Sequence, residues 1–136
     1  MSQENVELVR ALFGEWGRGN FWAMTELYAP DVEWRWSRHA RALRGGRASY
    51  TGLAEIAAAM QEWLEDWGWF RVSAEEFIDA GDHVVVLSEV SARLEGGRGE
   101  VRDHQADVIT IRKGRIVRME TFDDRAEALE AVGLRG

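Results

Sequence analysis

The most informative feature of this sequence is a change in the spacing of its apolar residues near position 70. Before that point, apolar residues recur every three or four positions, as in Val6, Val9, Phe13 and Trp16, which is the pattern of an amphipathic helix. After it, apolar and polar residues alternate, which is typical of β-strands. Helices followed by strands predict an α+β fold, with the helices packed on one face of a largely antiparallel sheet.

The first half of the chain is predicted to form three helices and one strand. The first helix ends at Gly17, because glycine favours the left-handed end of a helix. A second, short helix is predicted over residues 20–29, since the residue before Pro30 is pushed out of the helical region. A strand follows at residues 32–36. The third helix is predicted within residues 51–68, between a threonine cap and a closing glycine.

The second half is predicted to form four strands and a closing helix, which starts at Asp123 or Asp124. Turns that contain glycine or aspartate separate the strands, at residues 70–78, 84–94, 101–112 and 116–122. The predicted order is therefore α-α-β-α-β-β-β-β-α, and 136 residues is the usual length of one domain. A curved mixed or antiparallel sheet wrapped around the N-terminal helices would form a cone-shaped barrel, with room for a small ligand on its concave side.

The composition excludes several classes of function. The net charge of −7 argues against a nucleic-acid-binding surface, which needs a basic face. The chain has no cysteine, so disulfides and cysteine-ligated metal sites are excluded. No apolar run approaches the ~20 residues that span a bilayer, and the N-terminus lacks the pattern of a signal peptide. We therefore expect a cytoplasmic protein that binds neither nucleic acid nor membrane.

Four stretches of the sequence carry motifs that can be compared with known families. They are residues 19–34, which include Leu-Tyr-Ala-Pro-Asp-Val-Glu-Trp, residues 50–53, residues 108–120 around Lys-Gly-Arg-Ile-Val, and residues 123–134. In these stretches the chain resembles the SnoaL-like polyketide cyclase-type proteins of the nuclear transport factor 2-like (ketosteroid isomerase-like) superfamily. The resemblance implies one cone-shaped domain over residues 1–136. It does not define an activity, because the superfamily includes isomerases, cyclases, dehydratases, epoxide hydrolases and non-catalytic binding proteins.

Asp107 is the most informative polar residue. Strand alternation places it on the same face as Gln105 and Ile109, in an apolar setting where an unpaired carboxylate is costly to bury. The resemblance to ketosteroid isomerases puts Asp107 at the position of an aspartic acid that stays protonated and donates a hydrogen bond to an oxyanion. Burial raises the pKa of a carboxyl group, so such a group can remain neutral near pH 7. The alternative is a structural aspartate paired with an arginine or an indole N–H.

Asp123 is the second candidate for acid–base chemistry. In the resemblance to SnoaL-type cyclases it lies nearest to an acid/base aspartate on the last strand, and with Asp107 it would divide the acid and base roles. The alternative role of Asp123 is to cap the closing helix. Other parts of the ketosteroid isomerase site do not carry over, because Leu12 occupies the position of a tyrosine donor and Trp34 lies at or beside that of the general base.

The remaining candidate site residues are expected to form the wall of the cavity or to add polar groups to it. They are Trp34, Trp36, Tyr50, Met60, Trp63, Val86, Val90, Gln105, Ile109, Met119 and Thr121. No histidine has a second ligand at metal-binding spacing in the sequence, so neither a metal nor another cofactor is expected. The family resemblance implies a homodimer through the outer sheet face, where the predicted strands place Glu89, Ser91, Arg93, His104, Ala106 and Val108.

Three functions remain open at this point. The first is a cofactor-free acid–base enzyme of isomerase, cyclase, lyase or hydrolase type that acts on a hydrophobic, oxygenated molecule. In such an enzyme Asp107 would be the polar centre, with Gln105, Tyr50 and Asp123 as helpers. The second is a protein that binds such a molecule without turning it over. The third is a dimeric assembly domain that works through its sheet surface.

Overall fold

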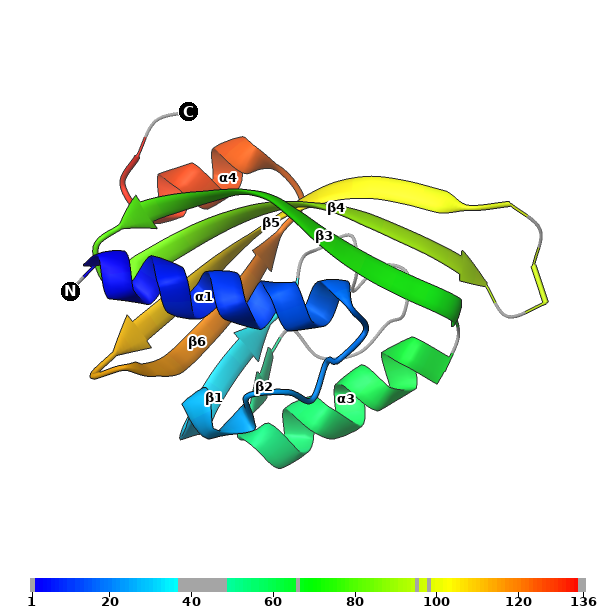
Figure 1. Ribbon diagram of the computed structural model, residues 1–136, viewed down its shortest axis with the longest axis horizontal. Coiled ribbons are helices and arrows are strands. Elements are labelled where there is room, and N and C mark those ends of the chain that lie inside the picture. The colour runs from blue at the N-terminus through cyan, green and yellow to red at the C-terminus, as the bar shows by residue number, and fades with distance from the viewer. Residues whose placement is uncertain (1, 37–48, 66, 95, 98, 135–136) are drawn as a thin grey trace.

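The computed structural model describes residues 2–36, 49–65, 67–94, 96–97 and 99–134 (Figure 1). The helical elements are α1 (Ser2–Gly17), the 3₁₀ turn η1 (Thr25–Leu27), α3 (Leu53–Glu65) and α4 (Arg125–Ala131). The strands are β1 (Tyr28–Arg35), β2 (Ser49–Thr51), β3 (Trp67–Ala80), β4 (His83–Leu94), β5 (Val101–Arg112) and β6 (Arg115–Phe122).

The described strands form one curved sheet in the order β2-β1-β6-β5-β4-β3. β1 and β6 run parallel, and the other neighbouring strands run antiparallel, so the sheet is mixed. The β5–β6 hairpin turns at Lys113 and Gly114, which have φ angles of 52° and 75°. This left-handed conformation suits a two-residue hairpin turn. The α+β class and the order of helices and strands predicted from the sequence are confirmed.

The sheet is not closed into a barrel, which corrects the expected cone-shaped barrel. Its edges are β2 and β3, and β2 is only three residues long. α3 contacts β1, β2 and β3, so this helix bridges the opening between the two edges (Figure 1). A short edge strand and a helix therefore complete an enclosure that strand pairing alone leaves open.

The second helical segment is shorter than the helix predicted over residues 20–29. Met24 takes a left-handed conformation with φ 59° and ψ 32°, which an α-helix cannot continue through. Only the turn η1 is helical after it. Tyr28 then begins β1 and pairs with Ile116 of β6. Thr51 likewise belongs to β2, and α3 starts at Leu53.

The core consists of two buried clusters, one on each face of the sheet. The concave face, defined here as the face that packs against α1, joins this helix to the sheet through Val9, Leu12, Phe13, Val84, Val86 and Ile109. The opposite, convex face packs against α4 through Val85, Ala106, Val108, Ala128 and Leu129. Because α4 covers Ala106 and Val108, these two residues are unavailable to the dimer interface expected on that face.

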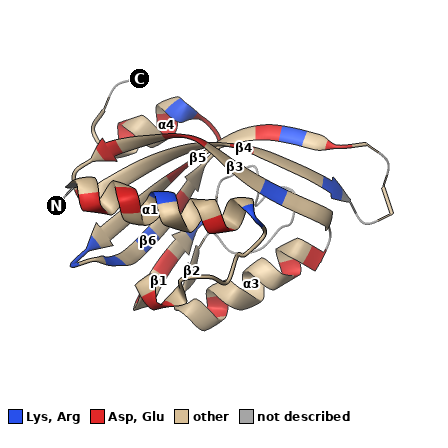
Figure 2. Ribbon diagram, in the orientation of Figure 1, with Lys and Arg blue, Asp and Glu red and all other residues tan. Residues whose placement is uncertain are grey.

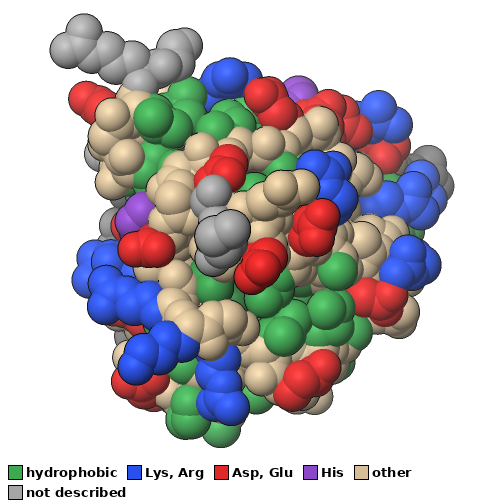
Figure 3. Space-filling view, turned by 60° about the vertical axis from the view of Figure 1, so that its left-hand side comes forward, with side chains coloured by type: hydrophobic (Ala, Val, Ile, Leu, Met, Phe, Trp, Pro, Cys, Tyr) green, Lys and Arg blue, Asp and Glu red, His purple; other side chains and the backbone are tan. Residues whose placement is uncertain are grey.

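Figure 3 shows one side of the molecule, on which hydrophobic side chains alternate with acidic and basic ones. The large apolar side chains are mostly buried, and among the described residues the exposed exceptions are Trp22, Trp69, Val101 and Leu134.

Candidate functional site

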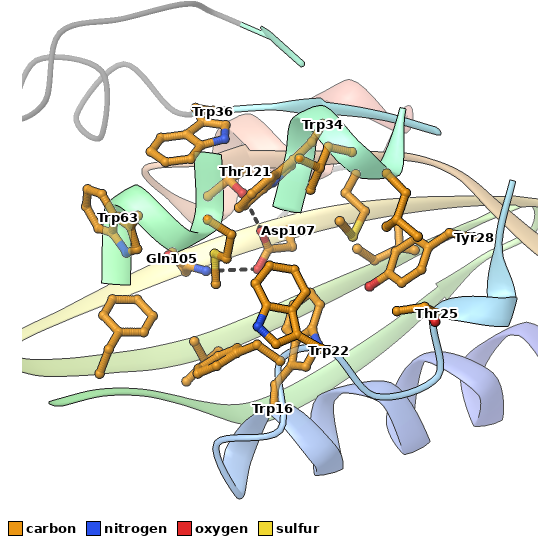
Figure 4. Close-up of a pocket in the computed structure, with 18 residues that line it drawn as sticks. Trp16, Trp22, Thr25, Tyr28, Trp34, Trp36, Trp63, Gln105, Asp107 and Thr121 are labelled. Atoms are coloured by element: carbon orange, nitrogen blue, oxygen red, sulfur yellow. Dashed lines mark hydrogen bonds between the residues drawn. The ribbon is translucent and has the colours of Figure 1, made fainter. Parts of the chain in front are cut away.

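A cavity of about 100 Å³ lies between the concave face of the sheet, the end of α1, α3 and the segment that leads into β1 (Figure 4). Much of its wall is aromatic, and the rings pack on one another, with centroids 5.0 Å apart for Trp34 and Trp36 and 5.4 Å apart for Trp36 and Trp63. The packed rings do not fill this space, and the cavity that remains can hold a small ligand. The lining residues are Trp16, Phe21, Trp22, Thr25, Tyr28, Trp34, Trp36, Leu53, Ile56, Met60, Trp63, Phe70, Val72, Gln105, Asp107, Ile109, Met119 and Thr121.

Asp107 is the only acidic residue among the described residues of this lining. It lies in the middle of β5, between Val86 of β4 and Thr121 of β6, and is only 5% exposed. Two side chains donate hydrogen bonds to its carboxylate (Figure 4). The amide Nε2 of Gln105 lies 3.0 Å from Oδ2, and the hydroxyl Oγ1 of Thr121 lies 2.6 Å from Oδ1.

The surroundings of Asp107 change its acidity. Burial raises the pKa of this carboxyl group to about 6, and the hydrogen bonds from Thr121 and Gln105 act in the opposite direction. At pH 7 the group is therefore mainly ionised, and both hydrogen bonds favour the ionised form. This does not support the neutral donor expected at pH 7. It favours a carboxylate that can accept a proton.

Tyr28 adds to the cavity a hydroxyl group that was not among the site residues predicted from the sequence. The residue is buried at the start of β1, and Figure 4 shows its phenol oxygen turned toward the interior of the cavity. Burial raises the pKa of Tyr28 well above its usual range, so the phenol stays protonated and can donate a hydrogen bond. The sequence predicted a helix over residues 20–29, in which Tyr28 would be a helical residue. The side chain of Tyr28 points into the cavity because this residue pairs with Ile116 of β6.

Most of the residues predicted to form the site do meet around the cavity. Asp107, Gln105, Ile109, Met119 and Thr121 come from β5 and β6, where strand alternation gave the correct face. The other lining residues that were predicted are Trp34, Trp36, Met60 and Trp63. Their roles in binding or catalysis remain predictions.

Four predicted site residues do not line the cavity. Val86 is fully buried in the core beneath α1, and Val90, further along β4, packs against the same core. Tyr50 lies on β2, and its ring packs against Trp36 with centroids 5.8 Å apart. Asp123 follows the end of β6 and lines a second hollow beside α4. It is not the helix cap, because Asp124 accepts a 2.8 Å hydrogen bond from the backbone N–H of Glu127.

The N-terminal segment forms a side of the cavity that the sequence did not predict. These residues are Trp16, Phe21, Trp22, Thr25 and Tyr28, with Leu53, Ile56, Phe70 and Val72 from α3 and β3. Trp16 and Ile56 continued helical apolar stripes, and Phe70 and Val72 alternated along a strand. Such patterns predict a buried face, but they do not show which part of that face borders a space.

Three side chains on the convex face, two exposed and one half-buried, come together in a way that the sequence spacing did not show. Glu75, Glu89 and His104 lie on β3, β4 and β5, with ligand atoms within 4.8 Å of one another, and His104 Nε2 lies 3.6 Å from Glu75 Oε1. Strand pairing therefore gives His104 carboxylate neighbours that are distant in sequence. The cluster lies on the other side of the sheet from the cavity.

The family of the chain follows from sequence comparison. Residues 9–119 match the SnoaL-like domain, and the chain belongs to this family. It is also 32% identical over 123 residues to the uncharacterized protein Rv0034 of Mycobacterium tuberculosis, a match that covers 87% of each chain. None of the described helices is long and apolar enough to cross a membrane.

Solved structures share the fold. An NTF2-like protein of unknown function from Burkholderia pseudomallei has a TM-score of 0.77 at 24% identity, over 96% of this chain and 98% of that one. TerC, co-crystallised with polyporic acid, has a TM-score of 0.76 at 24% identity, over 95% and 98% of the two chains. These similarities establish the NTF2-like architecture expected from the sequence.

Proposed function

We propose that this protein is a cofactor-free acid–base enzyme that acts on a small, hydrophobic, oxygen-bearing molecule in the cavity. The observation that carries the proposal is the buried Asp107 carboxylate, held by two hydrogen bonds in a wall that is otherwise mainly apolar. An apolar cavity with a few converging polar groups and a carboxyl of perturbed pKa is the usual form of a small-molecule site. The co-crystal of TerC with polyporic acid supports a role for this fold in holding small organic molecules.

Asp107 acts as the general base in the proposed reaction. Its carboxylate accepts a proton from a carbon next to a carbonyl group, the C–H electron pair forms the new C=C bond, and the carbonyl π electrons move to oxygen. A pKa of about 6 makes the group largely ionised at pH 7 yet basic enough to accept the proton. The proton then returns to the same or another carbon, so neither oxidant nor metal is consumed.

Tyr28 stabilises the oxygen that becomes negative. Its phenol remains protonated in the buried site, and a hydrogen bond to an oxyanion is stronger than one to a neutral carbonyl. Asp123 has no part in this step, because it lies outside the cavity. With a single titrating base, the rate is expected to rise through pH 6 to a plateau instead of following a bell-shaped curve.

Deuterium exchange tests the proposal. With 2-tetralone as probe in D₂O, the wild-type protein is expected to accelerate exchange at the carbons beside the carbonyl, as followed by proton NMR. Asp107→Asn should reduce exchange to the solvent rate, and Tyr28→Phe should slow it by 10²-fold or more, on the order of an oxyanion donor's contribution. Asp103→Asn, at the exposed end of the same strand, should keep the wild-type rate. If 2-tetralone binds in the cavity without any protein-dependent exchange, the protein is a binding protein and the enzyme proposal is wrong.

The protein is further proposed to form a homodimer through the part of the convex face that α4 leaves uncovered. β3, β4 and β5 extend beyond the helices there and carry both acidic and basic residues (Figure 2). Arg102 lies 4.0 Å from Glu89, and opposite charges of this kind can pair between two copies related by a two-fold axis. Sedimentation equilibrium should give a dimer mass for the wild type and a monomer mass for Arg93→Glu. A monomeric wild type would overturn this part of the proposal.

A further inference from the structure

Trp22 differs from the other residues of the cavity wall because about half of its surface faces solvent. It is 48% exposed, whereas the other lining residues in the described part of the chain are buried or half-buried. Trp22 comes from the segment between α1 and β1, and the almost fully buried Asp107 comes from β5 (Figure 4). Asp107 therefore lies inside the cavity, and Trp22 forms part of the rim where the cavity meets solvent.

The ring of Trp22 also lacks the aromatic packing that fixes most of the wall. Among the described residues, no other ring lies against Trp22, whereas most aromatic residues of the lining pack on at least one other ring. The packed residues are Trp16, Phe21, Trp34, Trp36, Trp63 and Phe70. Aromatic rings favour stacked or edge-to-face contacts, so the ring of Trp22 is available to an aromatic part of a ligand.

The turn that carries Trp22 is fixed by hydrogen bonds to the end of α1. The backbone N–H of Asn20 donates to the carbonyl oxygen of Glu15 at 2.9 Å, and the side-chain amide of Asn20 donates to the Glu15 carboxylate, also at 2.9 Å. After Trp22, Met24 takes its left-handed conformation. A defined backbone therefore presents Trp22 at the rim, which lowers the entropy that a ligand contact has to overcome.

The size and charge of the cavity limit what can occupy it. At about 100 Å³ it is smaller than the ~150 Å³ apolar cavity that admits benzene, so a ligand that reaches Asp107 places no more than about one ring inside. A larger ligand continues past the rim, where Trp22 offers an apolar surface. No Lys, Arg or His occurs among the described residues of the lining, and Asp107 is negatively charged, so the site suits a neutral ligand better than an anionic one.

We infer that Trp22 is a specificity-determining residue, and that the substrate is a neutral carbonyl compound with two fused rings. The ring that bears the carbonyl group lies inside the cavity beside Asp107, and the second, aromatic ring stacks on Trp22 at the rim. This inference rests on the proposed function of the same cavity and names its class of substrate. Trp22 adds affinity without taking part in the proton transfer, because it contacts the ring that does not react.

Binding of phenol and 2-naphthol to the protein, measured by calorimetry, tests the ring contact without catalysis. Both probes are neutral at pH 7 and carry one hydroxyl group that can donate to Asp107, and they differ by the second ring. Trp22→Ala should weaken binding of 2-naphthol about tenfold, on the order of one aromatic contact, and leave binding of phenol unchanged. Trp22→Phe should retain most of the affinity for 2-naphthol. Unchanged binding of 2-naphthol by Trp22→Ala would overturn the inference, and so would equal weakening for both probes, which would show that Trp22 only supports the fold.

Trp69→Ala is the matched control. Trp69 is also an exposed tryptophan, at 36%, but it lies on β3 and does not belong to the cavity lining. This variant should bind phenol and 2-naphthol as the wild type does. If Trp69→Ala weakens binding of 2-naphthol as much as Trp22→Ala does, the effect is not specific to the rim of the cavity and the inference is wrong.

The kinetics of 2-tetralone exchange give a second readout, because 2-tetralone carries its carbonyl group on one of two fused rings. Trp22→Ala should raise KM about tenfold and leave kcat unchanged, since the ring contact is equally strong in the substrate complex and in the transition state. If the wild type catalyses exchange and Trp22→Ala keeps the wild-type KM, the inference fails while the proposed reaction stands. If binding of 2-naphthol depends on Trp22 but the wild type catalyses no exchange, the ring contact is supported and the proposed reaction fails.

Discussion

The acidity of Asp107 depends on the residues that surround its carboxyl group. A carboxylate in an apolar wall is destabilised by lost hydration, and Thr121 and Gln105 recover part of that loss through hydrogen bonds. Because burial raises the pKa of Asp107 more than the two hydrogen bonds lower it, this pKa stays near 6. The same loss of hydration has two effects. It makes the ionised carboxylate unfavourable for folding, and it raises the pKa of the carboxyl group into the range that suits proton transfer near neutral pH.

Replacing Asp107 with asparagine is expected to stabilise the protein near neutral pH. The folded pKa is raised from 3.8 to about 6, so the stability that wild type gains from a protonated Asp107 is present below pH 4 and lost as the pH rises through 6. Asparagine is neutral throughout. The unfolding free energy of Asp107→Asn relative to wild type should therefore increase by about 2–3 kcal/mol between pH 4 and pH 7.5.

Urea denaturation at several pH values measures this difference. Asp103→Asn, which changes an exposed carboxylate on the same strand, should show a much smaller change over that range. A constant difference between Asp107→Asn and wild type would mean that Asp107 is not desolvated in the folded protein.

Thr121 is expected to act through Asp107 as a positioning residue. Its hydroxyl lowers the pKa of that carboxyl, so Thr121→Val should raise it. The pH–rate profile for 2-tetralone exchange should then shift toward higher pH with its plateau retained. Thr25→Val, which changes another lining threonine, should leave the midpoint in place. An unmoved midpoint in Thr121→Val would contradict the assigned hydrogen bond.

At the scale of helices and strands, local pattern predicted the elements with strong periodicity. The third predicted strand of the hairpin series, residues 101–112, matches β5, and residues 116–122 differ from β6 by one residue. β2 was missed because its three residues form a strand only by pairing with β1, as in Trp34 with Tyr50. The helix predicted over residues 20–29 was too long for a similar reason. Tyr28 pairs with β6 and therefore belongs to β1.

The N-terminal cap of α4 is expected to stabilise the folded protein. The side chain of Asp124 caps the helix, and the helix holds Ala128 and Leu129 against the convex face. Asp124→Ala should lower the unfolding free energy by about 1 kcal/mol, whereas Asp124→Asn should preserve most of it, because asparagine is an equally good cap. Thermal unfolding followed by circular dichroism compares the two. Equal losses in both variants would show that the cap does not stabilise α4.

At the scale of the whole molecule, the sheet separates two environments. Its concave face carries the core under α1 and the cavity, and its convex face is partly covered by α4. Alternation along β5 was enough to place Gln105, Asp107 and Ile109 together on the concave face. It could not predict that Trp16, Trp22 and Tyr28 would border the same space, because that depends on how the chain between α1 and β1 crosses the sheet.

Titration of the Asp107 carboxyl group by NMR shows whether this group is desolvated in the folded protein. Protein labelled with ¹³C at aspartate side-chain carboxyl carbons is titrated by NMR, and the Asp107 signal is identified by its loss in Asp107→Asn. We expect a midpoint near pH 6 for this signal, because the Asp107 carboxylate is buried in the wall of the cavity. A midpoint near pH 4, the ordinary value for aspartate, would contradict it.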